Sequence, residues 1–235
     1  MEIEFLKKIV KEAEHITQQD FVVHQKDSKG DLVTNLDLEV EKYLINQIKQ
    51  NYPDYDIVSE EFNKDGQVTD NCFVIDPIDG TINFANGLPM WGTQIACRTN
   101  GETVASVIHL PKLHEFYYAD KTGAYLNGQK ITIREVPLKN ALYSIVGNEP
   151  LPPTIKMLKY SKSYLNLRAS CMTFALMASG RIHGVNFRIE QPWDYAPGLF
   201  LCQMAGAKIK DKKGFHAAAM NQEFLDILEK ETTYI

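Results

Sequence analysis

The sequence lacks any long uninterrupted apolar run, and it has only 4 cysteines in 235 residues. No window approaches the roughly 18 consecutive apolar residues that a membrane-spanning helix requires. The amino-terminal segment alternates in charge and does not resemble a signal peptide. The cysteines lie singly in apolar stretches, which predicts buried thiols rather than a zinc site or disulfides. These absences predict a protein of the reducing cytoplasm with no membrane partner.

An excess of basic residues is also absent. Lysine and arginine total 25, whereas aspartate and glutamate total 30, which gives a net charge of −5. A negatively charged surface argues against a nucleic-acid partner. A small anionic ligand stays compatible with this charge, because one bound metal ion can reverse the sign of a local site. With 44% apolar residues, the composition is that of an ordinary globular chain.

Hydrophobic periodicity predicts helices and strands along the whole chain. The predicted helices extend over residues 2–18, 36–51, 172–180, 195–206 and 221–230. The predicted strands include residues 72–75, 143–146 and 208–210. Polar residues 23–32, which include Lys26, predict a mobile loop.

Residues 91–135 alternate between apolar and polar side chains in the manner of strands. Asn100-Gly101 and Asn127-Gly128 within this stretch have the composition of two-residue hairpin turns. The pattern therefore predicts an antiparallel meander in the first half of the chain.

Two carboxylates follow the predicted strand 72–75 in a way that a structural role alone does not explain. Asp76 and Asp79 are three residues apart, and Pro77 fixes the turn between them. Ionised carboxylates held in one small volume repel each other, and a bound cation is the usual stabiliser. Carboxylate-rich ligation suits a hard ion, Mg²⁺ before Ca²⁺ or Mn²⁺. Asp37, taken alone, has the position of a helix cap.

Gly80 and Thr81 come directly after the second aspartate. A glycine lets a ligand approach the backbone closely. Residues 81–86 predict a short helix that ends at Gly87, and its free N–H groups at Gly80 and Thr81 would face an anion such as phosphate. An Asx turn with a helix cap would explain Asp79 and Thr81, but it leaves Asp76 and Gly80 unexplained.

Four motifs occur in one order along most of residues 1–206. They are Asp31-Leu-Val-Thr-Asn-Leu-Asp37, Ser59-Glu-Glu61, Ile75-Asp-Pro-Ile-Asp-Gly-Thr-Ile-Asn-Phe84 and Pro192-Trp-Asp-Tyr-Ala-Pro-Gly198. With them the chain resembles the inositol monophosphatase family, a group of Mg²⁺-dependent, lithium-sensitive phosphomonoesterases. The resemblance implies an α+β fold, a layered α-β-α-β-α sandwich, and a homodimer.

The resemblance also implies roles for individual residues. The implied metal ligands are the side chains of Glu60, Asp76, Asp79 and Asp194 and the carbonyl of Ile78. The implied phosphate-binding groups are the backbone amides of Asp79, Gly80 and Thr81. Thr81 and Asp37, alongside Glu60, would activate the attacking water. The cofactor would be two or three Mg²⁺ ions, with Mn²⁺ as a possible substitute and Li⁺ as an inhibitor, and the loop around Lys26 would close near them.

Phe187 and Arg188 mark the place where the resemblance breaks down. Family members that act on inositol phosphate carry a glutamate seven residues before the aspartate of the Trp-Asp pair, and here Phe187 has that position. An aromatic ring and an added arginine would favour a substrate with a ring or a second phosphate, so both residues are candidate substrate contacts. The alternative is that Phe187 is a core residue.

The sequence thus predicts Mg²⁺-dependent hydrolysis of a small-molecule phosphate monoester by metal-activated water. The substrate stays open among an inositol phosphate, fructose 1,6-bisphosphate or another sugar bisphosphate, the 2′-phosphate of NADP, and a nucleotide 3′-phosphate. A catalytically silent protein that binds metal or a phosphorylated metabolite is the alternative from another class. We expect residues 1–140 to form the α+β half that binds metal and phosphate. Residues 141–235 would form an α/β half that contributes Asp194 and the substrate pocket.

Overall fold

The structure, a computed structural model, describes residues 2–25, 32–145, 156–188 and 191–232. Its helices are α1 (Glu2–Ala13), α2 (Asn35–Asn51), α3 (Thr81–Ala85), α5 (Ser170–Ala178), α6 (Pro192–Met204) and α7 (Gln222–Thr232). Short 3₁₀ turns are η1 (Ile16–Gln18), η2 (Pro111–Leu113) and η3 (Leu138–Asn140). None of the helices in the described ranges is long and apolar enough to cross a membrane.

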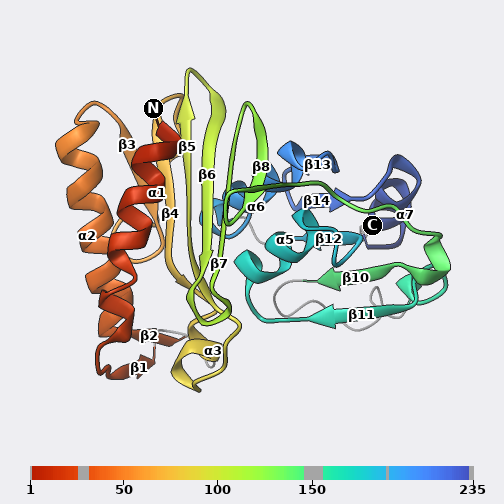
Figure 1. Cartoon of the computed structure of the whole chain (residues 1–235), viewed down its shortest axis with the longest axis horizontal. Coiled ribbons are helices and arrows are strands. Elements are labelled where there is room, and N and C mark those ends of the chain that lie inside the picture. Colours follow the sequence, from red (N-terminus) through yellow and green to blue (C-terminus); the bar gives the residue numbers. More distant parts are fainter. Residues whose placement is uncertain (1, 26–31, 146–155, 189–190, 233–235) are drawn as a thin grey trace.

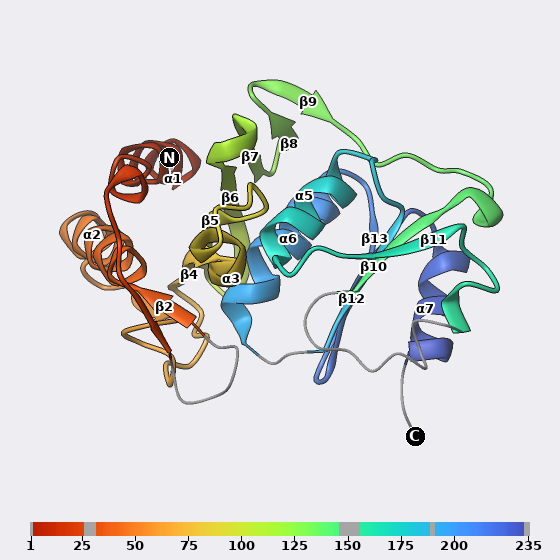
Figure 2. The ribbon, with the colours of Figure 1, turned by 90° about the horizontal axis from the view of Figure 1, so that it is seen from below.

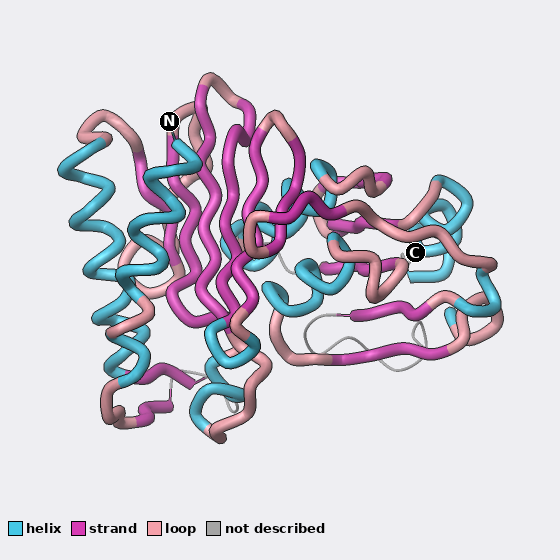
Figure 3. Tube along the Cα trace, in the orientation of Figure 1, coloured by secondary structure: helices cyan, strands magenta, loops and turns pink. Residues whose placement is uncertain are grey.

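The first sheet has seven strands in the order of the sequence. They are β3 (Asp56–Ser59), β4 (Cys72–Asp79), β5 (Gly92–Thr99), β6 (Glu102–Leu110), β7 (Glu115–Asp120), β8 (Gly123–Leu126) and β9 (Gln129–Ile131). β3 pairs with β4 in parallel, and every later pair is antiparallel (Figure 3). Asn100 and Asn127 have positive φ, and so do the glycines that follow them, as hairpin turns of this composition require. The predicted meander is confirmed.

The second sheet has five strands in the order β11-β10-β12-β14-β13. They are β10 (Leu142–Ile145), β11 (Ser163–Asn166), β12 (Gly184–Phe187), β13 (Lys208–Lys212) and β14 (Phe215–Ala219). The sequence predicted β10 and β13 but not the other three. β14 is alanine-rich, and β11 and β12 are four residues long, so neither composition nor alternation marks them as strands. That each half of the chain forms its own domain stays a prediction.

Sheets and helices stack in five layers. α1 and α2 cover one face of the seven-stranded sheet, and α5 and α6 fill the space between the two sheets (Figures 1 and 2). α7 covers the outer face of the five-stranded sheet (Figure 2). One apolar cluster lies under α1 and α2, and a larger one lies around α5 and α6. The predicted α-β-α-β-α sandwich is confirmed.

The predicted loop over residues 23–32 needs correction. β1 (Val23–Gln25) and β2 (Leu32–Thr34) form an antiparallel hairpin at the start of α2. Their side chains are mostly exposed or half-buried, so the apolar alternation that would have revealed them is missing. Lys26 lies outside the described residues.

Several predicted boundaries also differ from the structure. The first helix ends at Ala13 and is followed by a separate 3₁₀ turn. α6 begins at Pro192 rather than 195, because proline is well suited to the first turn of a helix. β4 does not stop at residue 75 but continues through Pro77, with a register shift between Asp76 and Asp79.

α5 and α6 pack closely because α6 has a glycine at the contact. A Cβ atom on Gly198 would lie 2.2 Å from two ring atoms of Phe174, which is 0% exposed. The absence of a side chain at Gly198 therefore sets how closely the two central helices approach.

We predict that Gly198→Ala destabilises the protein by about 1–3 kcal/mol in urea unfolding, because the added methyl overpacks this contact. Alanine is the better helix former by roughly 0.5–1 kcal/mol, so the effect of packing opposes that of propensity. Gln203→Ala, at an exposed position of the same helix, is the matched control and should leave stability within about 0.5 kcal/mol. A Gly198→Ala variant as stable as the wild type would contradict the close contact.

Candidate active site

The end of β4 brings two carboxylates to one side of the sheet. Asp76 pairs with Gln94 and Asp79 pairs with Gly92, and the irregularity between them includes Pro77. Proline cannot donate to the ladder and is found in sheets at such irregularities. The Thr93 hydroxyl donates to the Pro77 carbonyl at 2.8 Å, which fixes the irregular segment to β5.

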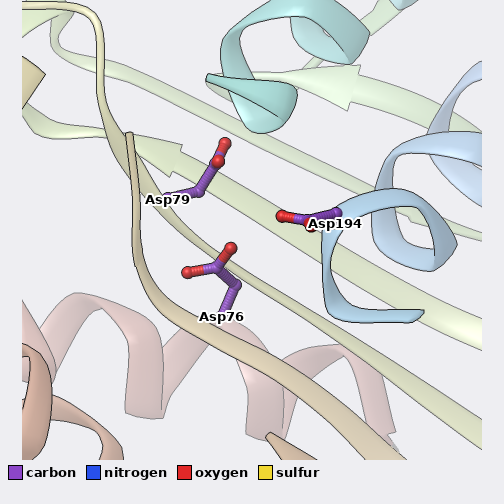
Figure 4. Close-up of side chains that lie close together, drawn as sticks. All are labelled: Asp76, Asp79 and Asp194. Atoms are coloured by element: carbon purple, nitrogen blue, oxygen red, sulfur yellow. The ribbon is translucent and has the colours of Figure 1, made fainter. Parts of the chain in front are cut away.

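Asp194 reaches the same place from the first turn of α6. One carboxylate oxygen from each of Asp76, Asp79 and Asp194 lies within 4.8 Å of the other two. Figure 4 shows the three side chains around a common volume, two from the β4 segment and one from the helix. The structure thus joins three of the residues that the sequence singled out as metal ligands.

Both neighbours of Asp194 anchor the start of α6. Trp193 packs into a small apolar cluster on the sheet with Val74 and Ala96, among others. Tyr195 stacks on His216, with ring centroids 3.6 Å apart and planes 10° apart. His216 in turn contacts Asp211 at 2.6 Å through Nδ1. The helix start is therefore fixed on two sides, which sets the direction of the carboxylate between them.

The electrostatic state of Asp76 is the clearest sign of a cation site. Asp76 is 1% exposed, and its Oδ1 has no hydrogen-bond partner. Burial raises the pKa of Asp76 well above its usual range, and the charges of Glu60, Asp79 and Asp194, among others, raise it further. A buried carboxylate oxygen without a donor, next to other carboxylates, is an arrangement that a cation would satisfy.

Asp79 is held from the second half of the chain. The backbone N–H of Cys171, in the first turn of α5, donates to Asp79 Oδ2 at 2.5 Å. Burial raises the pKa of Asp79, and hydrogen bonds from Cys171 and Ser170 lower it in part. The N-terminal turn of α5 thus fixes one oxygen of Asp79.

A glycine is favoured at position 80 for two reasons. Its φ is +86°, a backbone conformation that residues other than glycine rarely adopt. A Cβ atom there would also lie 2.9 Å from the Cβ of Ala169, the residue just before α5. The sequence predicted glycine here for access by a ligand, and the structure adds the contact with Ala169.

Thr81 and Asp37 meet at the start of α3. The Thr81 hydroxyl lies 3.0 Å from the Ile78 carbonyl and 3.3 Å from Asp37 Oδ1, and its single proton can be donated to either. The other Asp37 oxygen accepts from the Thr34 backbone N–H at 2.7 Å and from its hydroxyl at 2.5 Å. Asp37 therefore belongs to the N-terminal cap of α2, which is the helix-capping role that its position in the sequence predicted. It is also a partner of Thr81.

Glu60 follows β3 and is half-buried. It is not among the three carboxylates within 4.8 Å, but its charge is one of the main causes of the raised pKa of Asp76. The turn that contains Glu60 donates hydrogen bonds to the Glu41 carboxylate. The sequence did not single out Glu41 as a functional residue. Glu41 lies inside the amphipathic pattern of α2, where a single glutamate gives no signal of its own.

Phe187 lies in β12, is 1% exposed and belongs to the apolar cluster around α5 and α6. This burial agrees with the core alternative. That Phe187 lines a substrate pocket stays a prediction. Arg188, the next residue, is half-buried, and its role as a substrate contact stays a prediction.

The residues present fit a hard divalent cation. The donor set that the described residues bring together is made of carboxylates and contains neither thiolates nor imidazoles. The sulfur of Cys171 lies 4.0 Å from the Asp79 carbonyl oxygen. Burial raises the pKa of this thiol well above the usual range, which disfavours the thiolate that metals bind.

The layered fold and this buried carboxylate cluster define a class of α+β proteins with a candidate cation site beside a glycine turn. The model of the inositol monophosphatase family matches residues 3–230. The chain belongs to the inositol monophosphatase family, whose enzymes are phosphoric monoester hydrolases.

Individual relatives agree with the family match. The chain is 33% identical over 213 residues to the fructose-1,6-bisphosphatase/inositol-1-monophosphatase of Thermotoga maritima, which covers 86% of this chain and 80% of the relative. It is 31% identical over 224 residues to Nus factor SuhB of Escherichia coli, covering 87% and 80%. Among solved structures, an IMPase of Thermotoga maritima superposes with a TM-score of 0.87 at 27% identity, covering 97% of this chain and 95% of that one.

We predict that Asp76→Asn raises the melting temperature of the metal-free protein at pH 7. The folded chain holds the Asp76 pKa above its unfolded value, so folding binds protons and stability falls as pH rises above about 4. Removing the ionisable group removes this loss, and each kcal/mol corresponds to about 2–4 °C for a chain of this size. The measurement is thermal unfolding with a chelator at pH 4 and 7, and the difference should shrink at pH 4.

Asp65→Asn, at an exposed position, is the control and should not move the midpoint. Adding Mg²⁺ should stabilise the wild type more than Asp76→Asn, because a ligand that binds only the folded state stabilises it. A metal-free Asp76→Asn variant less stable than the wild type at pH 7 would show that repulsion does not dominate this site.

Proposed function

We propose that this member of the family hydrolyses a small-molecule phosphate monoester with Mg²⁺ held by Glu60, Asp76, Asp79, Asp194 and the Ile78 carbonyl. The cluster of Asp76, Asp79 and Asp194, with an unpartnered buried oxygen, is the observation that carries the proposal. Bound Mg²⁺ would supply Lewis acidity at the phosphate and a more acidic water.

The chain's own groups would bind the phosphate and orient the attacking water. The backbone N–H groups of Gly80 and Thr81 lie at the start of α3, where N–H groups favour an anion. The Thr81 hydroxyl would accept a hydrogen bond from the water while it donates to Asp37 Oδ1. Water attacks phosphorus, the ester oxygen leaves as the alcohol, and free phosphate is released.

Asp37 can orient Thr81 because its own position is fixed. Its second oxygen is engaged by Thr34 at the N-terminus of α2, and the side chain is 0% exposed. The carboxylate therefore presents one oxygen in one direction, which is what a positioned acceptor requires. This arrangement supports the roles proposed for Thr81 and Asp37.

An inositol phosphate or a sugar bisphosphate is the proposed substrate class, on the strength of the Thermotoga relative's name. Acidic residues are present at all four side-chain positions proposed as metal ligands, which argues against a catalytically silent binding protein. Two or three Mg²⁺ ions, replacement by Mn²⁺, inhibition by Li⁺ and a homodimer are further proposals from the family. The Nus factor name belongs to that relative, and the expectation of no nucleic-acid partner stays a prediction.

The function is tested by phosphate release from a panel of esters with and without Mg²⁺. The panel contains inositol 1-phosphate, fructose 1,6-bisphosphate, NADP and a nucleoside 3′-phosphate. We expect turnover only with the metal, and loss of turnover in Asp194→Asn even at saturating Mg²⁺. The exposed variant Asp65→Asn should retain wild-type activity. Turnover of an ester by the chelated enzyme, or near wild-type activity in Asp194→Asn, would contradict the assignment.

We predict that Thr81→Ala lowers kcat by about 10² or more with little change in KM. The substitution keeps the backbone amide for phosphate and removes the hydroxyl that faces Asp37. Thr81→Ser retains the hydroxyl and should recover most of the activity. Steady-state kinetics of the three proteins decide the point, and a raised KM with unchanged kcat would reduce Thr81 to a binding group.

A further inference from the structure

Glu41 is a fully buried glutamate whose carboxylate is directed at one turn. It lies on α2, is 0% exposed and accepts three hydrogen bonds. Oε1 accepts from the Ser59 hydroxyl at 2.5 Å and from the Phe62 N–H at 2.7 Å. Oε2 accepts from the Glu61 N–H at 2.8 Å. All three donors belong to the four-residue segment Ser59–Phe62, which contains Glu60.

The turn also has contacts between its own residues. Ser59 and Asn63 form an isolated bridge, in which the Ser59 N–H donates to the Asn63 carbonyl at 3.4 Å. The Asn63 side-chain amide donates to the Ser59 hydroxyl at 3.2 Å. Both of these contacts are longer than the three hydrogen bonds to Glu41.

Glu41 also shares its helix face with Asp37. The two are one helical turn apart, at i and i+4, and both point into the protein rather than to solvent. One carboxylate meets Thr81 beyond the end of β4, and the other meets the turn after β3. Since β3 and β4 are adjacent parallel strands, this helix face lies across the ends of both.

We propose that Glu41 is a positioning residue, whose buried carboxylate fixes the Ser59–Phe62 turn so that Glu60 faces the cluster of Asp76, Asp79 and Asp194. The inference rests on the proposed function, because it takes Glu60 as a ligand of that site. Glu41 itself does not touch the substrate or the ion.

The chemistry of the three donors requires a carboxylate at this position. Two donors are backbone N–H groups that cannot accept a hydrogen bond, and they contact different oxygens of Glu41. A glutamine has the same shape but only one acceptor atom. In either orientation its NH₂ group would therefore meet one of the two N–H donors, and a buried donor would be left unsatisfied.

A ligand turn held in this way would be pre-organised for the cation. Residues that orient metal ligands typically change metal affinity by about 10- to 100-fold when they are removed. If Glu41 were purely structural, its replacement would instead lower the stability of α2 as a whole and leave cation affinity unchanged in the folded protein. The two roles therefore differ in a measurable way.

The first experiment is backbone amide exchange by NMR on metal-free Glu41→Gln. We expect exchange at Glu61 and Phe62 to rise by about tenfold or more, because hydrogen bonds to a charged group are among the stronger ones. Glu39→Gln, at an exposed position of the same helix, is the matched control and should leave these amides unchanged. Leu44→Ala, in the core of α2, controls for lost stability alone. Unchanged exchange at both amides in folded Glu41→Gln would overturn the proposal.

The second experiment measures Mn²⁺ affinity by water-proton relaxation in the same variants, without any substrate. We expect Glu41→Gln to bind the ion about tenfold more weakly or worse, with Glu39→Gln and Leu44→Ala like the wild type. Faster exchange with unchanged Mn²⁺ affinity would make Glu41 merely structural and would also overturn the proposal. Neither readout depends on turnover, so a failed phosphatase assay and a failed positioning role are distinguishable.

Ser59→Ala serves if Glu41→Gln does not fold. It removes one donor to Glu41 from the opposite side and keeps the carboxylate. A smaller loosening of the Glu61 amide with a smaller loss of Mn²⁺ affinity would support the proposal. An unchanged Mn²⁺ affinity together with a loosened turn would contradict it.

Discussion

Three carboxylates of like charge lie within 4.8 Å of one another where water has little access, and the surrounding structure holds them there. A free chain would separate such charges, so the arrangement exists only because β4, α5 and α6 leave these side chains no other place. We expect this crowding to lower the stability of the metal-free protein, and a bound divalent cation would make the interaction favourable. The position of each neighbouring element can be understood from this one constraint.

The constraint links the two sheets. Asp79 is the last residue of β4 in the seven-stranded sheet, and its carboxylate is fixed by the N-terminal turn of α5. Asp194 reaches the cluster from the first turn of α6. The side-chain amide of Asn83, just after the glycine turn, donates to the Leu167 carbonyl at 2.9 Å and so bridges the same gap. The cluster therefore combines two residues of a strand, Asp76 and Asp79, with one residue of a helix, Asp194.

The sequence predicted the parts of the site that are local. Asp76, Asp79, Gly80 and Thr81 lie in one short segment, so their spacing alone announces a crowded pair of acids next to an anion-binding turn. Asp194 lies far along the chain, and only a resemblance to a family could connect it with them. The layered fold followed from the same resemblance, and the meander followed from alternation. Three strands of the second sheet, β11, β12 and β14, were not predicted from the sequence.

What the sequence could not predict are contacts whose partners are far apart and chemically unremarkable on their own. Glu41 reads as a polar residue within an amphipathic helix, and its burial depends on a turn that begins 18 residues later. The resemblance to the family suggested that Phe187 lines a substrate pocket. The strand that contains it turns its ring into the core, and the direction of a side chain on a short strand is not encoded in composition.

Asp37 shows why structural and catalytic interpretations of one residue need not compete. A carboxylate has two oxygens, and here one oxygen accepts from Thr34 at the helix N-terminus while the other lies toward Thr81. The capping contact removes rotational freedom that a solvated aspartate would keep, so the second oxygen has a defined direction before any substrate binds. A helix cap placed beside the site thus contributes to its pre-organisation. Glu41, one turn further along the same face, engages both of its oxygens with the neighbouring turn, so α2 can place two parts of the site by one rigid element.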